Sequence, residues 1–380
     1  METYLDHNAT TPLDGRVLDE MLPYLQHYFG NPSSVYRQGR LARQTVETAR
    51  EQVAQLVNVH PTQVIFTSGG TEANNLAIKG AVRSLNRIAV SAVEHASVME
   101  PAREVASQGA RLVEISVDEQ GKVTSESMQQ ALAYQPQLVS VMLANNETGV
   151  IQNVATFAEM AKSAGALFHT DAVQAAGKME IDFAALGVEL MSLSSHKIYG
   201  PKGVGALIID RQVELAAQLV GGGQEKGYRS GTENVAAIVG FGKAAELAIQ
   251  ELGQRQLRSE QLKLKLLHGL AQIEQVVVFA REVESLSNTI FMAVPGIDGE
   301  TLLMEMDRAG VAISSGSACD SQKADASHTL LAMGVEESLA HCAVRVSIGK
   351  DNVEADIDIF LKVLSEQVRA QQEHAMLAWA

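Results

Sequence analysis

Two reactive side chains stand out in this sequence, a lysine at the end of an apolar run and a cysteine at the end of a run of small residues. Lys197 closes the stretch SLSSHK at 192–197, and Cys319 closes the stretch SSGSAC at 314–319. A lysine amine can hold a carbonyl cofactor as a Schiff base, and a thiolate can attack sulfur or carbon. Together they indicate an enzyme that breaks a bond in an amino acid and takes the leaving group onto its own cysteine.

Two further polar side chains follow apolar runs that are typical of strands. Asp171 comes after the run at 166–168. A carboxylate there is costly to bury without a partner, and a cationic ring nitrogen would suit it, although a helix N-cap is the alternative. His95 follows the run at 87–91 and could stack on a ring or move protons, or be a hydrogen-bonded surface histidine.

Two glycine-containing stretches could hold a phosphate group. Gly70 and Thr71 lie in TSGGTE at 67–72, where a strand gives way to a helix whose first N–H groups can bind an anion; a plain capped turn is the alternative. The second stretch contains Thr232 in RSGTEN at 229–234. It could be a flexible loop, or it could reach into the phosphate site of a neighbouring subunit.

An arginine and an asparagine could bind a carboxylate. Arg345 lies within an apolar strand-like run and needs an anionic partner, and a substrate α-carboxylate would fit its bidentate fork. Asn146 belongs to NNETG at 145–149, which could bind a hydroxyl or carboxylate or simply form a turn. Cys319 lies among polar residues, as a reactive thiol does, whereas Cys342 enters a strand and fits a core position.

Alternating strands and helices must position these residues. Candidate strands occupy 64–67, 87–91, 111–115, 138–142, 167–169, 190–193 and 206–209. Helical spacing between them predicts an α/β domain with a mostly parallel sheet, and ligands bind at the carboxyl ends of such strands. A nearly continuous helix at 234–275 leads to strands at 277–279, 288–293 and 343–348, which predict a second, smaller α+β unit.

The composition excludes several classes of protein. The chain has 380 residues, enough for two domains, and its net charge of −15 argues against general binding to nucleic acid or anionic membranes. Two cysteines without zinc-ligand spacing predict no metal site and fit a reducing cytosol. We expect a cytoplasmic protein, because no signal peptide and no apolar run of about 18 residues is present.

The order of these motifs resembles that of the cysteine desulfurases of the NifS/IscS type, in the class-V aminotransferase family of fold-type I enzymes that use pyridoxal 5′-phosphate. The resemblance extends from residue 4 to about residue 349. The motifs that carry it are YLDHNATT at 4–11, FGNPSS at 29–34, the turn at 67–72, NNE at 145–147, HTDAVQ at 169–174, SHK at 195–197, RSGTEN at 229–234 and SSGSAC at 314–319.

The resemblance also implies an architecture. It predicts a homodimer in which each chain has a large cofactor-binding domain at 14–252 with a seven-stranded, mostly parallel sheet. Residues 1–13 and 253–380 would form a small domain that carries a mobile Cys319 loop.

The resemblance assigns roles to individual residues. Lys197 would bind the cofactor covalently, Asp171 would pair with its ring nitrogen, and His95 would stack on the ring and assist proton transfer. Arg345 and Asn146 would hold the substrate carboxylate. The remaining cofactor contacts would be Asn146, Gln174, Gly70, Thr71, Ser194, His196 and, from the other subunit, Thr232.

The implied reaction converts L-cysteine to L-alanine, leaves a persulfide on Cys319 and passes the sulfur to an acceptor protein for iron–sulfur cluster assembly or thiolation. Alternatives are a selenocysteine lyase, another C–S lyase or aminotransferase of the same fold, and a non-catalytic relative that only binds partners. The stretch at 320–328 departs from the family pattern, and Asp320 would raise the pKa of the neighbouring thiol.

Overall fold

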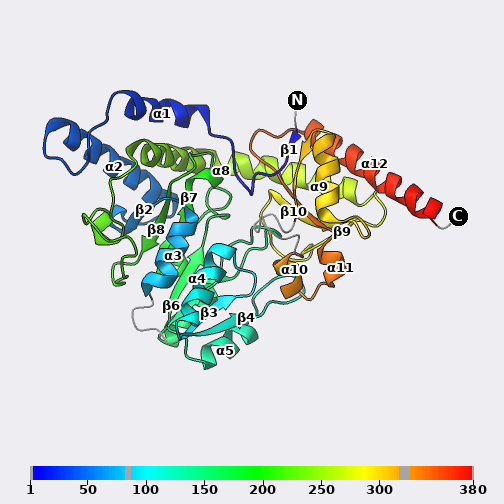
Figure 1. Ribbon diagram of the computed structural model, residues 1–380, viewed down its shortest axis with the longest axis horizontal. Helices are drawn as coiled ribbons and strands as arrows, with labels where there is room; N and C mark the ends of the chain where they lie inside the picture. Colours follow the sequence, from blue (N-terminus) through cyan, green and yellow to red (C-terminus); the bar gives the residue numbers. More distant parts are fainter. Residues whose placement is uncertain (1–2, 82–86, 316–325, 379–380) are drawn as a thin grey trace.

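The described part of the chain folds around a large and a small β-sheet, with a further two-stranded sheet at the N-terminal segment (Figure 1). The computed structural model describes residues 3–81, 87–315 and 326–378. The strands of the large sheet are, in sheet order, β2 (Val64–Thr67), β8 (Gly205–Ile209), β7 (Leu190–Ser194), β6 (Leu167–Asp171), β5 (Leu138–Ser140), β3 (Arg87–Ser91) and β4 (Arg111–Ile115). All neighbours are parallel except at β8, which is antiparallel to β2 and β7. The predicted seven-stranded α/β fold is confirmed.

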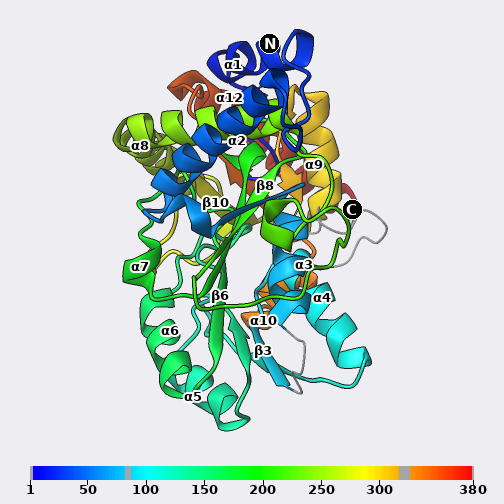
Figure 2. The same cartoon turned by 90° about the vertical axis from the view of Figure 1, so that its left-hand side faces the viewer.

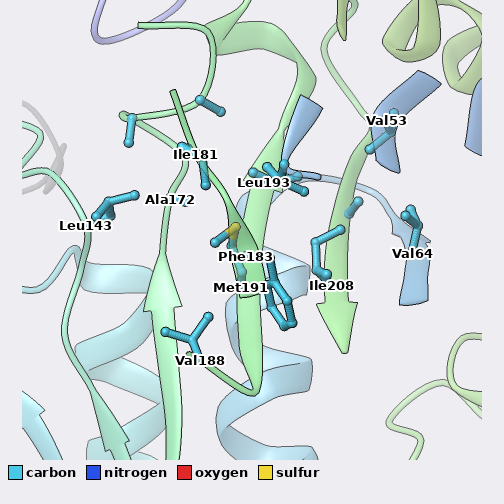
Figure 3. Close-up of a cluster of buried hydrophobic side chains, with 14 of the residues drawn as sticks. Val53, Val64, Leu143, Ala172, Ile181, Phe183, Val188, Met191, Leu193 and Ile208 are labelled. Carbon is cyan, nitrogen blue, oxygen red and sulfur yellow. The ribbon is translucent and has the colours of Figure 1, made fainter. Parts of the chain in front are cut away.

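Alternating apolar residues give the large sheet two buried faces. In β8, Ala206 and Ile208 pack on one side, and Leu207 and Ile209 pack on the other. The first face is covered by α2 (Arg37–Leu56), α5 (Ser125–Ala133), α6 (Val154–Ser163) and α7 (Phe183–Leu186), and the second by α3 (Gly70–Ala81) and α4 (Ala96–Ser107) (Figure 2). Figure 3 shows side chains from the first face. Because helices cover both faces of the sheet, a ligand-binding site is expected at the ends of the strands.

The long helix α8 (Val235–Leu270) runs beside both sheets (Figure 1). Near its start, Ile238 and Phe241 belong to the core of the large sheet, whereas Leu262 and Leu266 belong to that of the small sheet. The sequence predicted this helix and placed its end a few residues too late. One rigid element therefore connects the two cores.

The small sheet is antiparallel. Its order is β12 (Ser314–Ser315), β13 (Ala343–Ser347), β10 (Thr289–Ala293) and β9 (Val277–Val278). Its core includes residues of α9 (Gly299–Arg308) and α12 (Glu354–Ala378). The sequence predicted β9, β10 and β13 but not β12, because two residues carry no readable periodicity.

The N-terminal segment joins this smaller unit. β1 (Thr3–Tyr4) pairs in parallel with β11 (Val311–Ala312), and Leu5 lies in the core of the small sheet. This packing supports our proposal that 1–13 and 253–380 form the small domain and 14–252 the large one. The remaining helices are α1 (Gly15–Gln26), α10 (His328–Ala332) and α11 (Glu337–Ala340). Among the described helices, none has the length and apolar character needed to cross a membrane.

Candidate active site

A cavity of about 280 Å³ lies at the carboxyl ends of the central strands. Residues at the ends of β6 and β7 and residues that follow β3, β5, β6 and β7 line it, together with the start of α3, one residue of β13 and part of the N-terminal segment. Ten residues named from the sequence meet here: Gly70, Thr71, His95, Asn146, Asp171, Gln174, Ser194, His196, Lys197 and Arg345. The structure therefore gathers into one cavity side chains that are far apart in the sequence.

A chain of hydrogen bonds connects Asp171 with His95. Asn74 donates from Nδ2 to Asp171 Oδ2 at 2.7 Å and to Ser97 Oγ at 2.8 Å. His95 Nδ1 accepts from the Ser97 backbone N–H at 3.0 Å and lies 2.7 Å from Ser97 Oγ. Burial lowers the pKa of His95, so the ring is neutral near pH 7 with its proton on Nε2.

Asn74 and Ser97 were not predicted from the sequence as residues of the site. Asn74 is 1% exposed and lies in α3, where a buried amide is unexpected. In the helix, Asn74 follows Gly70 by four residues, which puts the two on the same face. This spacing could have revealed Asn74 from the sequence, because the stretch at 67–72 had already placed Gly70 in the predicted phosphate site.

The start of α3 has the features of an anion site. A Cβ at Gly70 would lie 2.9 Å from Val173 Cγ2, so glycine keeps the helix terminus open. The buried Ser194 Oγ has no hydrogen-bond partner among the described residues. Helix N-terminal N–H groups and a free hydroxyl beside them suit a phosphate. Burial lowers the pKa of the nearby His196 to about 4, so this ring is neutral.

Lys197 ends a short 3-10 turn after β7 (Ser195–Lys197). Its Nζ donates to the backbone oxygens of Asn8 at 2.5 Å and Ala9 at 2.7 Å. The residues that hold the amine thus come from the N-terminal segment. Asp171 and Lys197 line the same cavity, so one ligand could meet both the carboxylate and the amine.

Arg345 has a carboxylate partner that the sequence did not reveal. Its Nη2 lies 2.7 Å from Asp6 Oδ1, and its Nη1 donates to the Asn146 backbone oxygen at 3.0 Å. In β13 it is 4% exposed. Its Nε and the Asn146 Oδ1 are buried without partners among the described residues. These two groups are still available to a ligand in the cavity.

Comparison with known proteins identifies the family. The model of the aminotransferase class-V family matches residues 3–360. The chain belongs to this family. The cysteine desulfurase IscS of Clostridium botulinum strain Hall is 40% identical over 383 residues, which cover 99% of this chain and 96% of that protein.

Solved structures agree with this assignment. One described as a NifS-like protein has a TM-score of 0.91 and 36% identity, and the match covers 97% of this chain and all of that one. A second, described as SspA in complex with cysteine, has a TM-score of 0.82 and 29% identity over 93% of this chain and all of that one. Within the class-V aminotransferases, the chain is one of the cysteine desulfurases of the IscS/NifS type.

The class-V aminotransferase family implies pyridoxal 5′-phosphate, and the cavity fits this cofactor. Lys197 offers an amine for the cofactor aldehyde, and Asp171 offers a carboxylate for the ring nitrogen. The start of α3 offers an anion site for the phosphate. The unpartnered atoms of Ser194 and Asn146 are explained if a polar ligand occupies the cavity.

Two residues named from the sequence are not among the described residues that line the cavity of this class-V aminotransferase chain. Thr232 is exposed and does not line the cavity, so its assignment to the site of another subunit stays a prediction. Cys319 lies outside the described residues. On the N-terminal side of Cys319, the described residues end in β12, where Ser314 is opposite Arg345. They begin again at Ala326, and Ser327 Oγ donates to Glu147 Oε2 at 2.5 Å. Cys342 is buried, and its Sγ donates to the Ser338 backbone oxygen at 3.3 Å.

Proposed function

We propose that this chain, with bound pyridoxal 5′-phosphate, removes sulfur from L-cysteine, holds it on Cys319 as a persulfide and releases L-alanine. The observation that carries the proposal is the convergence of Lys197, Asp171, His95 and an anion site on one cavity. The bound cofactor would supply an electron sink that weakens the bonds to the Cα atom of the amino acid.

The residues of the cavity divide the remaining tasks. Lys197 would hold the cofactor aldehyde, and Asp171, oriented by Asn74, would keep the ring nitrogen protonated. Gly70, Thr71, Ser194 and His196 would hold the phosphate, and Gln174 and Asn146 would contact the oxygen side of the ring.

Substrate binding and proton transfer belong to a second group of residues. Arg345 and Asn146 would bind the substrate carboxylate, Arg345 through Nε–H, which has no partner among the described residues, and Asn146 through the N–H of its amide. Lys197 and His95 would carry the proton that leaves Cα. Because Nδ1 of the neutral His95 ring already accepts from the Ser97 backbone N–H, the N–H at Nε2 is the group that His95 would offer in proton transfer.

Sulfur transfer is assigned to Cys319. Its thiolate attacks the sulfur of the substrate, the C–S bond breaks, and the carbon fragment takes up a proton and leaves as L-alanine. Cys319 keeps the sulfur until the thiol of an acceptor protein removes it. Because this chemistry needs a reduced thiol, we place the protein in the cytoplasm.

Replacing Cys319 with alanine tests the proposal. We expect Cys319→Ala to bind the cofactor normally and to lose desulfuration, measured as alanine plus persulfide or sulfide from L-cysteine. The matched control is Cys342→Ala, since the Cys342 thiol is buried against Ser338. Alanine formation by Cys319→Ala at the wild-type rate would refute the role of Cys319. Pyruvate and ammonia as products would identify a C–S lyase instead.

The dimer that we propose has support on the surface of the chain. The connection between α1 and α2 exposes large apolar side chains, with Phe29 79% and Val35 81% exposed. Such a cluster is typical of an interface. A second subunit that covers it could also bring Thr232 to the neighbouring phosphate site.

A further inference from the structure

We propose that Lys178 is a positioning residue for the cofactor site, which fixes the amide of Gln174 so that its N–H group faces the cavity. This inference rests on the proposed function, because it assigns to Gln174 a hydrogen bond to the oxygen side of the bound cofactor. Lys178 does not line the cofactor cavity itself. It borders a second cavity of about 40 Å³, which Lys197 also lines.

The amine of Lys178 is held between two amide side chains. Its Nζ donates to Gln174 Oε1 at 2.7 Å and to Asn8 Oδ1 at 2.8 Å. Gln174 Nε2 in turn donates to the Asn8 backbone oxygen at 3.0 Å. The three residues therefore form a closed ring of hydrogen bonds, in which Gln174, which is 5% exposed, and Asn8 line the cofactor cavity and Lys178 does not.

This ring determines which end of the Gln174 amide faces which neighbour. An amide has an accepting oxygen and a donating nitrogen of nearly the same shape, so packing alone does not distinguish its two orientations. A lysine amine beside it acts as a donor, which requires the Gln174 oxygen to face Lys178. The nitrogen then faces Asn8 and the cavity, and its second hydrogen remains for an acceptor on the bound cofactor.

The surroundings of Lys178 indicate that it is not there to form an ion pair. Within the described part of the chain, no carboxylate lies within ion-pair distance of its Nζ, and the two groups that accept from it are neutral amide oxygens. Burial and the nearby charges of Lys197 and Arg345 hold the pKa of Lys178 well below its usual range. The oxygens of Gln174 and Asn8 both accept from the Lys178 amine, which is the arrangement that the positioning role needs.

A double-mutant cycle on cofactor binding tests the proposal. The variants are Lys178→Met, Gln174→Ala and the double variant, and the measurement is the dissociation constant of pyridoxal 5′-phosphate, from visible absorbance on titration into apoprotein. We expect Lys178→Met to weaken binding several-fold, up to about tenfold, as for the loss of one hydrogen bond. The double variant should bind no more weakly than Gln174→Ala, because Lys178 acts through Gln174.

Lys263→Met is the matched control. Lys263 also donates to neutral oxygens, those of Ser285 Oγ and the Leu286 backbone, both at 2.8 Å, and burial lowers its pKa to about 8. It lines neither of the two cavities described above. Its loss should therefore leave the dissociation constant unchanged. A purely structural role for Lys178 would instead give additive losses in the double variant.

Gln174→Glu provides a second test that keeps Lys178 in place, in case Lys178→Met does not fold. The new carboxylate would accept from Lys178 as an ion pair but would offer no N–H to the cavity. We expect this apoprotein to unfold at a higher temperature than Gln174→Ala while binding the cofactor as weakly. A lower unfolding temperature than Gln174→Ala would overturn the proposal.

The outcomes separate this inference from the proposed function. Equal dissociation constants in the wild type and in Lys178→Met overturn the positioning role alone, whether or not the wild type desulfurates cysteine. A wild-type apoprotein that takes up no pyridoxal 5′-phosphate overturns the proposed function and the positioning role together.

Discussion

At the scale of single residues, buried polar side chains lie between the central strands beneath the cavity. Ser140 Oγ lies 2.8 Å from His169 Nδ1, and His169 Nε2 lies 3.0 Å from Ser192 Oγ. Glu94 Oε1 accepts from the Met142 backbone N–H at 2.6 Å, while Glu94 Oε2 is buried and has no hydrogen-bond partner among the described residues. Burial lowers the pKa of His169 to about 3 and raises that of Glu94 to about 8. These residues are therefore neutral near pH 7.

The raised pKa of Glu94 predicts a pH-dependent stability. In the unfolded chain the carboxyl releases its proton near 4.5, but in the folded chain only near 8. Its contribution to the free energy of unfolding is thus fully present below the lower value and is lost as the pH rises toward the higher one. Between about pH 5.5 and about pH 7.5, we expect the wild type to lose about 2 to 3 kcal/mol relative to Glu94→Gln.

Urea denaturation of the two apoproteins at both pH values measures this difference. The glutamine variant keeps the size and neutrality of the protonated side chain and has no group to titrate there, so it is its own control for packing. If the two free energies of unfolding change in parallel with pH, Glu94 does not titrate with the raised pKa.

At the scale of elements, the N-terminal segment connects the two sheets through Asn8. Asn8 Nδ2 donates to Thr289 Oγ1 of β10 at 2.9 Å, and the Asn8 backbone N–H donates to Ser347 Oγ of β13 at 2.9 Å. On the side of the large sheet, the Asn8 backbone oxygen accepts from Gln174 and Lys197. A single residue of irregular structure thus connects the small sheet to the cofactor site.

Replacement of Asn8 by alanine should therefore lower the stability of the folded chain. Asn8 is 1% exposed, so its loss leaves buried donors and acceptors without partners. We expect Asn8→Ala to lower the free energy of unfolding by about 2 to 4 kcal/mol, measured by urea denaturation. Asn153→Ala is a suitable control, because Asn153 is exposed and its side chain makes no cap hydrogen bond to α6. A similar loss in both variants would contradict the connecting role of Asn8.

At the scale of the whole molecule, the exposed apolar connection between α1 and α2 bears on oligomeric state. We expect the wild type to sediment as a dimer, and a variant with both Phe29→Glu and Val35→Glu to sediment as a monomer with weaker cofactor binding, because Thr232 of the second subunit would be absent. Leu264→Glu is the control, since Leu264 is 62% exposed but lies in the half of α8 beside the small sheet. A monomeric wild type in analytical ultracentrifugation would refute the dimer.

The sequence by itself determined the family, the order of the large sheet's strands along the chain and most of the cavity. Short runs such as β3 and β7 carry apolar residues on both faces, and this pattern is local. Motifs at the ends of such runs mark the site, because parallel strands bring their carboxyl ends to one edge of a sheet. That is why Asp171, His95 and Lys197 could be placed together without coordinates.

Only the tertiary structure decided which residues orient the side chains of the site. Asn74 orients Asp171, and Asp6 pairs with Arg345. Lys178 and Asn8 both form hydrogen bonds with Gln174. All of these contacts except the one between Lys178 and Gln174 join residues that are far apart in the sequence. Local periodicity carries no information about such partners, because a hydrogen bond between distant segments depends on where the packed cores place them. The sequence therefore indicates the groups that could carry out the chemistry, and the packing of the two sheets determines the groups that orient them.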